Sequence, residues 1–450
     1  MYDVNSVMKQ AKILSISQFL VKLSLGLVLL QTPLVVFLWS RFPSQALIFK
    51  SMADFIIIVN FVLSGWLAWQ NRTLFRQLRF WFWLTGGYIL INLVAALGSL
   101  AYPRSLLAGI VINLRYLLIF ITGLILSHLD KKFLAKISKI TLIFGGVVVL
   151  FGILQITVLP KDFLANFGYS QTTIMPYLVI DQNDAYVRIN STLRGPNPLG
   201  ALMVILASLT LSFFYFQGKI RTANKSNLLL FVGSLVILFV SHSRSAWLAA
   251  GIALALLLIF SIKTAKKLVW LTIISGLLIG ALGLGVLLIK DKNHSLVDEF
   301  EHLILHENSE TRHISSNQEH NNSVKFAWER ISEKSLLGYG VGAAGSASLF
   351  RPVEQHHIIE QQFLFVWYEL GVVGFLVFSL LWLVILQKIF IWRKNWLARA
   401  VFASGVGLVM IGLFLPVLVD SAVAISWWLL AGVLIGNLSY NKEQDGTKIN

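Results

Sequence analysis

Three arginines are the residues of this chain whose type and position best suit the binding of a charged substrate. Arg188 and Arg194 lie in VRINSTLRGPNPLG, immediately before an apolar run, and Arg244 lies in SHSRSAW, a short polar interruption between two apolar runs. The planar guanidinium binds phosphate oxygens through paired, charge-assisted hydrogen bonds. Arginines gathered at a membrane boundary therefore suit a phosphate group. Pairing with lipid headgroups or with a loop acid is the alternative for each of them.

A second set of candidates precedes a later apolar run, in the sequence EQHHIIEQQFLF. His356 and His357 lie four and three residues before Glu360, so the three side chains share one face if the helix begins early enough. Either Glu360 or a neighbouring histidine could then accept a proton from an attacking hydroxyl. A helix N-terminal acid and an ordinary interfacial histidine pair are the structural alternatives.

The composition places these residues in a membrane protein. The 450 residues are 56% hydrophobic and 13% charged, with a mean hydropathy of +0.75, which a soluble surface cannot accommodate. Apolar runs of about 20 residues recur without the alternation of a β-barrel, so we expect an all-α integral membrane protein, a polytopic bundle of about twelve transmembrane helices with a large extracytoplasmic loop. The expected spans are 17–39, 46–69, 80–101, 106–128, 137–159, 198–216, 227–240, 245–262, 268–290, 359–386, 396–416 and 421–438.

The distribution of charge orients this bundle. The formal net charge is +16, but the basic residues fall in every second connection, which is typical of cytoplasmic loops and argues against a nucleic-acid partner. We therefore expect both termini in the cytoplasm. The chain reads as one polytopic domain over 1–450, with an inserted extracytoplasmic loop over 291–358 and a second, smaller one over 160–197. The chain has no cysteine, which excludes disulfides, thiolate metal sites and a cysteine nucleophile.

Four sequence pieces in the same order resemble the O-antigen ligase and O-antigen polymerase superfamily of bacterial envelope glycan transferases. RGPNPLGALM resembles that family's entry to a span, and SHSRSAWLA resembles its Ser-Arg turn. FAWERISEKSLLGYGVGAAG resembles the stretch before its last signature helix, and EQQFLFVWYELGVVGFLVF resembles that helix. The resemblance runs from about Arg188 to Phe378, and the earlier spans match only in being hydrophobic.

The resemblance implies an enzyme of the cytoplasmic (inner) membrane with its active site on the outer face. Such an enzyme moves a glycan from a polyprenyl pyrophosphate carrier to a hydroxyl of a glycan, lipid or protein acceptor, without a cofactor or a metal. The family's pyrophosphate-binding arginines correspond to Arg194 and Arg244, with Arg188 placed less securely. Ligase-type members carry a His-Asn pair nine residues before the Glu of the Glu-Leu-Gly turn, whereas Glu360 and Gln361 stand there in this chain. A polymerase of the same superfamily therefore remains an alternative.

Other features indicate less specific chemistry. His302 and His306 have the spacing of a helical metal site, but the chain has no HExxH motif, and a solvated loop explains them better. The string GVGAAG fits a dinucleotide motif only in its letters, so we interpret it as flexible backbone. Arg115 and Glu369 fall inside spans and are a candidate internal ion pair.

A lipid or polysaccharide transporter is the main alternative from another class. Transporters concentrate polar residues near the membrane midplane and often contain discontinuous helices. In this chain the polar residues concentrate in the expected outer loops and at the outer boundary, and this favours an interfacial enzyme. We further expect a helix over 322–337, and an apolar groove below Arg244 for the carrier lipid.

Overall fold

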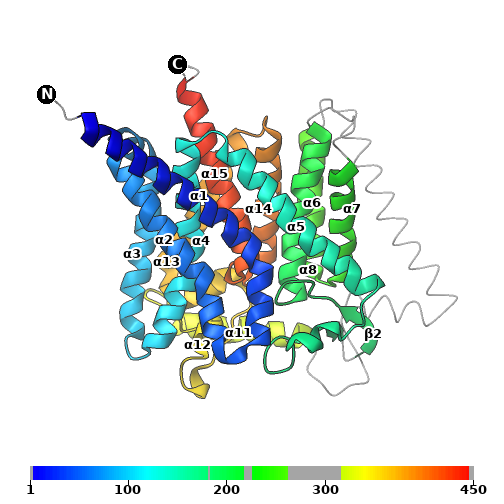
Figure 1. The fold of residues 1–450 in the computed structure, drawn as a ribbon. Helices are drawn as coiled ribbons and strands as arrows, with labels where there is room; N and C mark the ends of the chain where they lie inside the picture. Colours follow the sequence, from blue (N-terminus) through cyan, green and yellow to red (C-terminus); the bar gives the residue numbers. More distant parts are fainter. Residues whose placement is uncertain (1–3, 181–182, 217–224, 262–315, 445–450) are drawn as a thin grey trace.

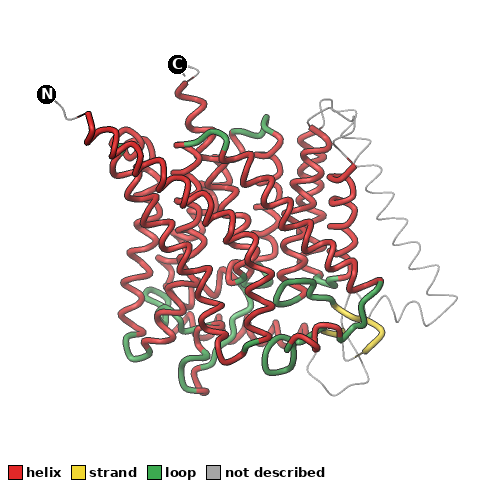
Figure 2. Tube along the Cα trace, viewed as in Figure 1, coloured by secondary structure: helices red, strands yellow, loops and turns green. Residues whose placement is uncertain are grey.

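The computed structural model describes residues 4–180, 183–216, 225–261 and 316–444, and within these ranges the chain is almost entirely helical (Figures 1 and 2). The helices are α1 (Val4–Arg41), α2 (Ala46–Gln70), α3 (Arg72–Ala96), α4 (Pro103–Leu129), α5 (Phe133–Thr157), α6 (Pro196–Phe216), α7 (Lys225–Val240), α8 (Arg244–Ser261), α11 (Ser316–Glu333), α12 (Gly345–Ser348), α13 (Gln362–Ile391), α14 (Trp396–Gly412) and α15 (Ser421–Gln444). One two-stranded antiparallel sheet is described, β1 (Leu178–Ile180) with β2 (Asn183–Arg188).

Eight of the described helices are long and apolar enough to cross a membrane, and α7, α8 and α14 are shorter apolar helices. Eleven of the expected spans coincide with these helices, and the twelfth, 268–290, lies outside the described residues. The helix expected over 322–337 is α11, which begins earlier and ends earlier than the spacing predicted. The all-α membrane class is confirmed, and a total of about twelve spans stays a prediction.

The centre of the bundle is formed by α4 and α15, which are parallel neighbours with buried faces. Gly432 and Gly436 of α15 face the backbone of α4, and a Cβ on either would overlap the carbonyl oxygens of Phe120 and Leu124. Small residues at such positions let two transmembrane helices approach closely, which is how helices associate where lipid replaces water. The outer helices α2 and α3 instead expose large apolar side chains, as lipid-facing helices do.

The polar connections that contain the candidate site residues lie at one end of this bundle. Both termini lie at the other end (Figure 1). The β-hairpin, the α7–α8 turn, α11, α12 and the segment between α14 and α15 lie at the end opposite the termini. The described parts of the two long polar connections therefore share one end, and their place outside the membrane stays a prediction.

Helix α13 is broken at Gly371, and another part of the chain occupies the break. Gly371 has a φ of 69°, and a Cβ there would overlap the Leu336 carbonyl. The segment after α11 pairs with the interrupted backbone: the Tyr339 N–H donates to the Tyr368 carbonyl at 2.7 Å and the Val372 N–H to the Ser335 carbonyl at 2.8 Å. A helix break in the bilayer needs such partners for its freed backbone groups. The break thus anchors the long polar segment to the bundle.

Candidate functional site

A cavity of about 350 Å³ lies at the end of the bundle opposite the termini, and we call it the arginine–glutamate cavity. One part of its lining comes from the end of β2, the start of α6, the α7–α8 turn and the start of α8. The other part comes from α11, the segment before α13 and the segment after α14. The lining residues are Arg188, Asn197, His242, Ser243, Arg244, Ser245, Leu248, His320, Glu360, Phe414 and Leu415.

Arg188 is held at the end of β2 by two neutral acceptors. Its Nε donates to the Ser241 carbonyl at 3.1 Å, and its Nη2 donates to Asn197 Oδ1 at 2.8 Å. Burial, and then the positive charge of Arg244, lower the pKa of Arg188 to about 10, so the guanidinium stays charged at neutral pH. Two guanidinium groups that repel each other beside a cavity are stabilised by a bound anion.

The backbone supports the same preference for negative charge. Asn197 lies in the first turn of α6, and Arg244 and Ser245 begin α8, so the N-termini of two helices border the cavity. A helix N-terminus carries a partial positive charge and amide N–H groups without helical partners. Phosphate groups bind at such ends.

His242, between Ser241 and Ser243 in the α7–α8 turn, adds a neutral polar group. Its backbone lies in the left-handed region, with a φ of 47°, which is uncommon for a residue other than glycine. Burial, and then the charge of Arg188, lower the pKa of His242. The imidazole is therefore uncharged at neutral pH, and it can exchange hydrogen bonds with hydroxyl groups.

Glu360 faces the cavity and is paired with His320 of α11. Glu360 Oε2 lies 3.0 Å from His320 Nδ1, and the Glu360 side chain is 33% exposed. In this contact the His320 Nδ1–H donates and the carboxylate oxygen accepts. Ser323, one turn further along α11, accepts from the Glu360 N–H and donates to the Ile358 carbonyl, both at 3.0 Å. Helix α11 thus positions both the side chain and the backbone of Glu360.

The expectation that His356, His357 and Glu360 share a helical face is wrong. Helix α13 begins at Gln362, and residues 356–361 are not helical, because the Glu360 N–H and the Ile358 carbonyl bond to Ser323 instead of to a helical ladder.

The two histidines have other neighbours. His356 Nε2 donates to the Arg351 carbonyl at 2.8 Å, and the His357 ring packs on Phe326 and Tyr368, with ring centroids 4.8 and 6.2 Å away. Neither histidine lines the arginine–glutamate cavity. A catalytic role for either stays a prediction that this geometry does not favour.

Arg194 also lies apart from the cavity lining. Its Nε donates to Asp420 Oδ2 at 2.6 Å, and Asp420 Oδ1 accepts from the Ala422 N–H at 3.0 Å at the start of α15. About half of the Arg194 side chain is exposed. The structure thus brings Arg188, Arg244 and Glu360 together, with Arg194 in an ion pair outside the lining.

The proposed ion pair between Arg115 and Glu369 is wrong. Arg115 Nη1 lies 3.5 Å from Asp54 Oδ1, and Nη2 donates to the Val419 carbonyl. Glu369 is fully buried and instead accepts from Asn113 Nδ2 at 2.7 Å and from the Ala344 N–H at 3.1 Å. The sequence shows which ionisable residues are buried, but it does not show how the helices are rotated, and rotation decides the partners.

The glycine-rich segment 338–345 has a structural part in this arrangement. Gly338, Gly340, Gly342 and Gly345 all have positive φ, and Ser105 Oγ of α4 donates to the Gly342 carbonyl at 2.6 Å. The segment is therefore fixed by hydrogen bonds between α4 and the break in α13. Within the described residues no group of three or more His, Asp or Glu side chains could hold a metal ion, and His302 and His306 lie outside those residues.

Sequence reasoning missed His320 and His242 as residues of the candidate site. His320 appears in the sequence only as one of several histidines in a polar stretch, forty residues before its partner. His242 directly precedes the SRSAW pattern, and this proximity to Arg244 was the one available signal.

Comparison with known proteins agrees with the sequence resemblance. Residues 229–379 match the family described as O-antigen ligase, and no curated protein matches the chain. The matched range contains Arg244, His320 and Glu360, whereas Arg188 precedes it. Across residues 229–379 the chain is therefore similar to the O-antigen ligase family, which supports the O-antigen ligase and polymerase superfamily.

Proposed function

We propose that this chain is a glycosyltransferase that moves a glycan from a polyprenyl pyrophosphate carrier to an acceptor hydroxyl at the outer face of the cytoplasmic membrane. The observation that carries the proposal is the arginine–glutamate cavity, where two guanidinium groups and a carboxylate–imidazole pair line one space. The O-antigen ligase match supports the class of substrate.

The chemistry uses each of these groups once. The acceptor hydroxyl oxygen attacks the anomeric carbon of the glycan, and the bond from that carbon to the pyrophosphate oxygen breaks. The hydroxyl proton passes to the Glu360 carboxylate, whose orientation His320 holds. The polyprenyl pyrophosphate leaves with the bonding electron pair, and Arg188 and Arg244 stabilise its negative charge. Neither task requires a metal.

The carrier lipid has an apolar approach to this cavity. Leu248, one turn along α8 from Arg244, lines the cavity and is 47% exposed, so the apolar edge of the cavity reaches the surface of the described bundle. Phe414 and Leu415 add apolar lining. A polyprenyl chain entering here would stay in the membrane while its pyrophosphate reaches the arginines.

The charge distribution supports an outward-facing cavity. The short connections at the end that carries the termini are basic, with Lys131 and Lys132 between α4 and α5, and Arg393 and Lys394 between α13 and α14. Basic short loops are cytoplasmic. The arginine–glutamate cavity, at the opposite end, then faces outward.

Orientation has a direct test, because the chain has no native cysteine. Glu354 and Lys394 are exposed at opposite ends of the bundle. In intact cells, a membrane-impermeant maleimide should label Glu354→Cys and leave Lys394→Cys unlabelled until the membrane is permeabilised. The reverse pattern would contradict the orientation.

Function is tested by reconstituting the purified full chain with a polyprenyl pyrophosphate-linked oligosaccharide and two kinds of acceptor. Transfer to a lipid core or a protein indicates a ligase, and transfer to a second lipid-linked glycan indicates a polymerase. We expect the double variant Arg188→Gln, Arg244→Gln to lose transfer in either case while remaining folded. Full transfer by this variant, or no transfer by the wild type to any acceptor, would refute the proposal.

A polymerase remains the second candidate, because Glu360 and Gln361 stand where ligase-type members have a His-Asn pair. A transporter is less well supported. Backbone hydrogen bonds from 335–340 bridge the discontinuity of α13 at Gly371, so the chain itself engages backbone groups that a transporter would offer to an ion.

A further inference from the structure

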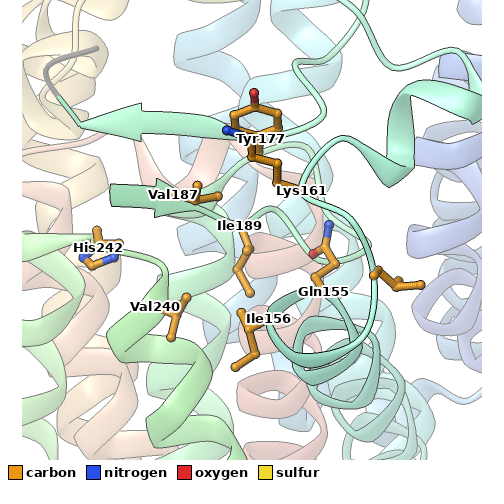
Figure 3. A pocket seen from close by; sticks show the side chains of 9 residues that line it. Gln155, Ile156, Lys161, Tyr177, Val187, Ile189, Val240 and His242 are labelled. Carbon is orange, nitrogen blue, oxygen red and sulfur yellow. The ribbon is translucent and has the colours of Figure 1, made fainter. Parts of the chain in front are cut away.

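A second cavity, of about 310 Å³, lies beside the first, and His242 lines both (Figure 3). Its lining comes from the end of α5 and the loop after it, from the residues around β1 and β2, and from the end of α7. Gln155, Tyr177 and His242 approach it from these different elements (Figure 3). We call it the hairpin cavity, after the β1–β2 pair beside it.

The hairpin cavity combines apolar walls with polar atoms that lack protein partners. Ile156, Val187 and Ile189 supply apolar surface. Gln155 Oε1 and His242 Nδ1 are shielded from solvent, and neither makes a hydrogen bond within the described residues. Buried polar atoms are almost always paired, so two orphaned atoms in the lining of one cavity indicate a missing hydrogen-bonding occupant.

The mixed character of the wall identifies the chemical class of that occupant. A sugar ring presents hydroxyl groups at its edge and apolar C–H groups on its faces, and the hydroxyls both donate and accept. Gln155 and His242 can exchange hydrogen bonds with such hydroxyls, and Tyr177 adds an aromatic ring, with Lys161 Nζ 5.5 Å from its centroid. The volume lies near the lower end of the ~300–1,000 Å³ typical of small-ligand sites, which suits a sugar ring.

The position of His242 indicates which substrate supplies the sugar. His242 is two residues from Arg244 in the chain and close enough to Arg188 to feel its charge. His242 therefore belongs to the part of the first cavity's lining that carries the two arginines. Glu360 and His320 belong to the other part, formed by the segment before α13 and by α11. With the pyrophosphate at the arginines, as proposed, the attached glycan would pass His242 and the acceptor hydroxyl would approach Glu360.

We propose that the hairpin cavity is a sugar-binding subsite of the donor glycan, which binds a residue of that glycan other than the one that reacts. The proposal rests on the proposed function and deepens it by assigning part of the substrate specificity to Gln155, Tyr177 and His242. The subsite contributes to donor binding and leaves the chemical step unchanged.

The test varies the length of the donor glycan in the reconstituted full-length protein. The probes are polyprenyl pyrophosphates carrying one sugar or the complete glycan of the native host, each varied at saturating acceptor. The variants are Tyr177→Ala and Gln155→Leu, with Tyr177→Phe as the conservative change. Gln171→Ala, at an exposed position of the same loop, is the matched control.

With the complete glycan, Tyr177→Ala should raise the donor KM about tenfold and leave kcat unchanged, as expected for the loss of an aromatic contact. Gln155→Leu should raise the donor KM less, and Tyr177→Phe and Gln171→Ala should resemble the wild type. With the one-sugar donor, all variants should match the wild type. A folding defect would impair transfer from both donors, so a rise in KM that is confined to the complete glycan indicates a lost sugar contact.

Two results would overturn the subsite. The first is an unchanged donor KM for both Tyr177→Ala and Gln155→Leu. The second is a rise in the KM for the acceptor in place of that for the donor. In either case, loss of transfer by Glu360→Gln in the same assay would show that the proposed function survives. Full transfer by Glu360→Gln would instead refute the Glu360 assignment in the proposed mechanism.

Discussion

Glu360 and Glu369 are nine residues apart in the chain, and they show two uses of a carboxylate in one membrane protein. Glu369 is fully buried in α13 and is held by Asn113 of α4 and by the Ala344 N–H, so its oxygens join three segments. Glu360 precedes the same helix, is a third exposed, and faces a cavity beside two arginines. A carboxylate that is enclosed by donors acts as a structural link, whereas a carboxylate at a cavity wall is available to a substrate.

The arginines repeat this contrast. Arg351 donates to Ser105 Oγ at 3.0 Å and to Ser99 Oγ at 2.7 Å, and it ties the segment after α12 to the turn before α4 and to α4 itself. Arg188 is also bound by neutral acceptors, but it lines a cavity and is repelled by Arg244. Position beside the cavity therefore separates the residues assigned to catalysis from those assigned to structure.

The largest expected effect tests the two glutamates against each other. Glu360→Gln should lower the transfer rate by about 10²–10⁴-fold without lowering the melting temperature, because a general base is lost from an accessible position. Glu369→Gln should destabilise the protein by about 1–3 kcal/mol, because one of the two buried donors loses its acceptor oxygen, while the folded fraction stays active. Thermal unfolding in detergent and transfer assays on the same samples measure both. Equal losses of transfer at unchanged stability would remove the distinction.

The arginines provide the next test. Arg188→Gln should lower kcat/KM for the donor by about 10²-fold, because a charged donor to the leaving pyrophosphate is removed. Arg351→Gln is the matched control, and it should mainly lower the melting temperature. The two effects are separated by measuring donor kinetics at a temperature where both variants are folded. If Arg351→Gln instead raises the donor KM more than Arg188→Gln does, the pyrophosphate does not bind in the arginine–glutamate cavity.

Substitution of His320 should lower the transfer rate less than substitution of Glu360 or Arg188 does. His320→Ala should lower kcat about tenfold and leave the donor KM unchanged, because Glu360 loses one hydrogen bond that orients it. His320→Asn, whose amide nitrogen can take the place of Nδ1 and still donate, should recover part of the rate. Ser323→Ala is the control for α11 docking, since Ser323 holds only the backbone around Glu360. A histidine that merely packs in α11 would show no rescue by asparagine.

The sequence predicted the helices well and the contacts less well, for a physical reason. Membrane helices follow from the length of apolar runs, and α1 to α8 and α13 to α15 coincide with runs that the sequence shows directly. Partners such as Arg115 with Asp54 and His320 with Glu360 depend on helix rotation and docking between segments that are distant in the chain. No local pattern encodes these.

The candidate site shows the same division. The polar turn at Arg244 and the polar run before α13 were evident, because charges stand out in an apolar chain. A helix that began before His356 would have aligned His356, His357 and Glu360, but α13 begins at Gln362. Ser323 of α11 binds backbone groups that the longer helix would need. A residue far along the chain therefore decided which side chain faces the cavity.

His357 gives the smallest expected effect, and it tests whether the base has been assigned to the correct residue. Burial, and then the charges of Arg330, Arg351 and His356, lower the pKa of His357. The folded protein thus binds this proton more weakly than the unfolded chain, whose imidazole has a pKa of about 6.5. As pH falls below about 6.5, protonation favours the unfolded chain and stability declines.

His357→Asn should therefore lose less stability than the wild type between about pH 7.5 and pH 5, by less than about 1 kcal/mol because the ring is partly exposed. Melting temperatures at the two pH values measure this difference. At neutral pH the variant should transfer glycan at about the wild-type rate, since the ring contacts Phe326 and Tyr368 and does not line the cavity. A loss of transfer as large as that of Glu360→Gln, at unchanged stability, would make the imidazole the base. The contrast between Glu360 and Glu369 would then describe two structural carboxylates.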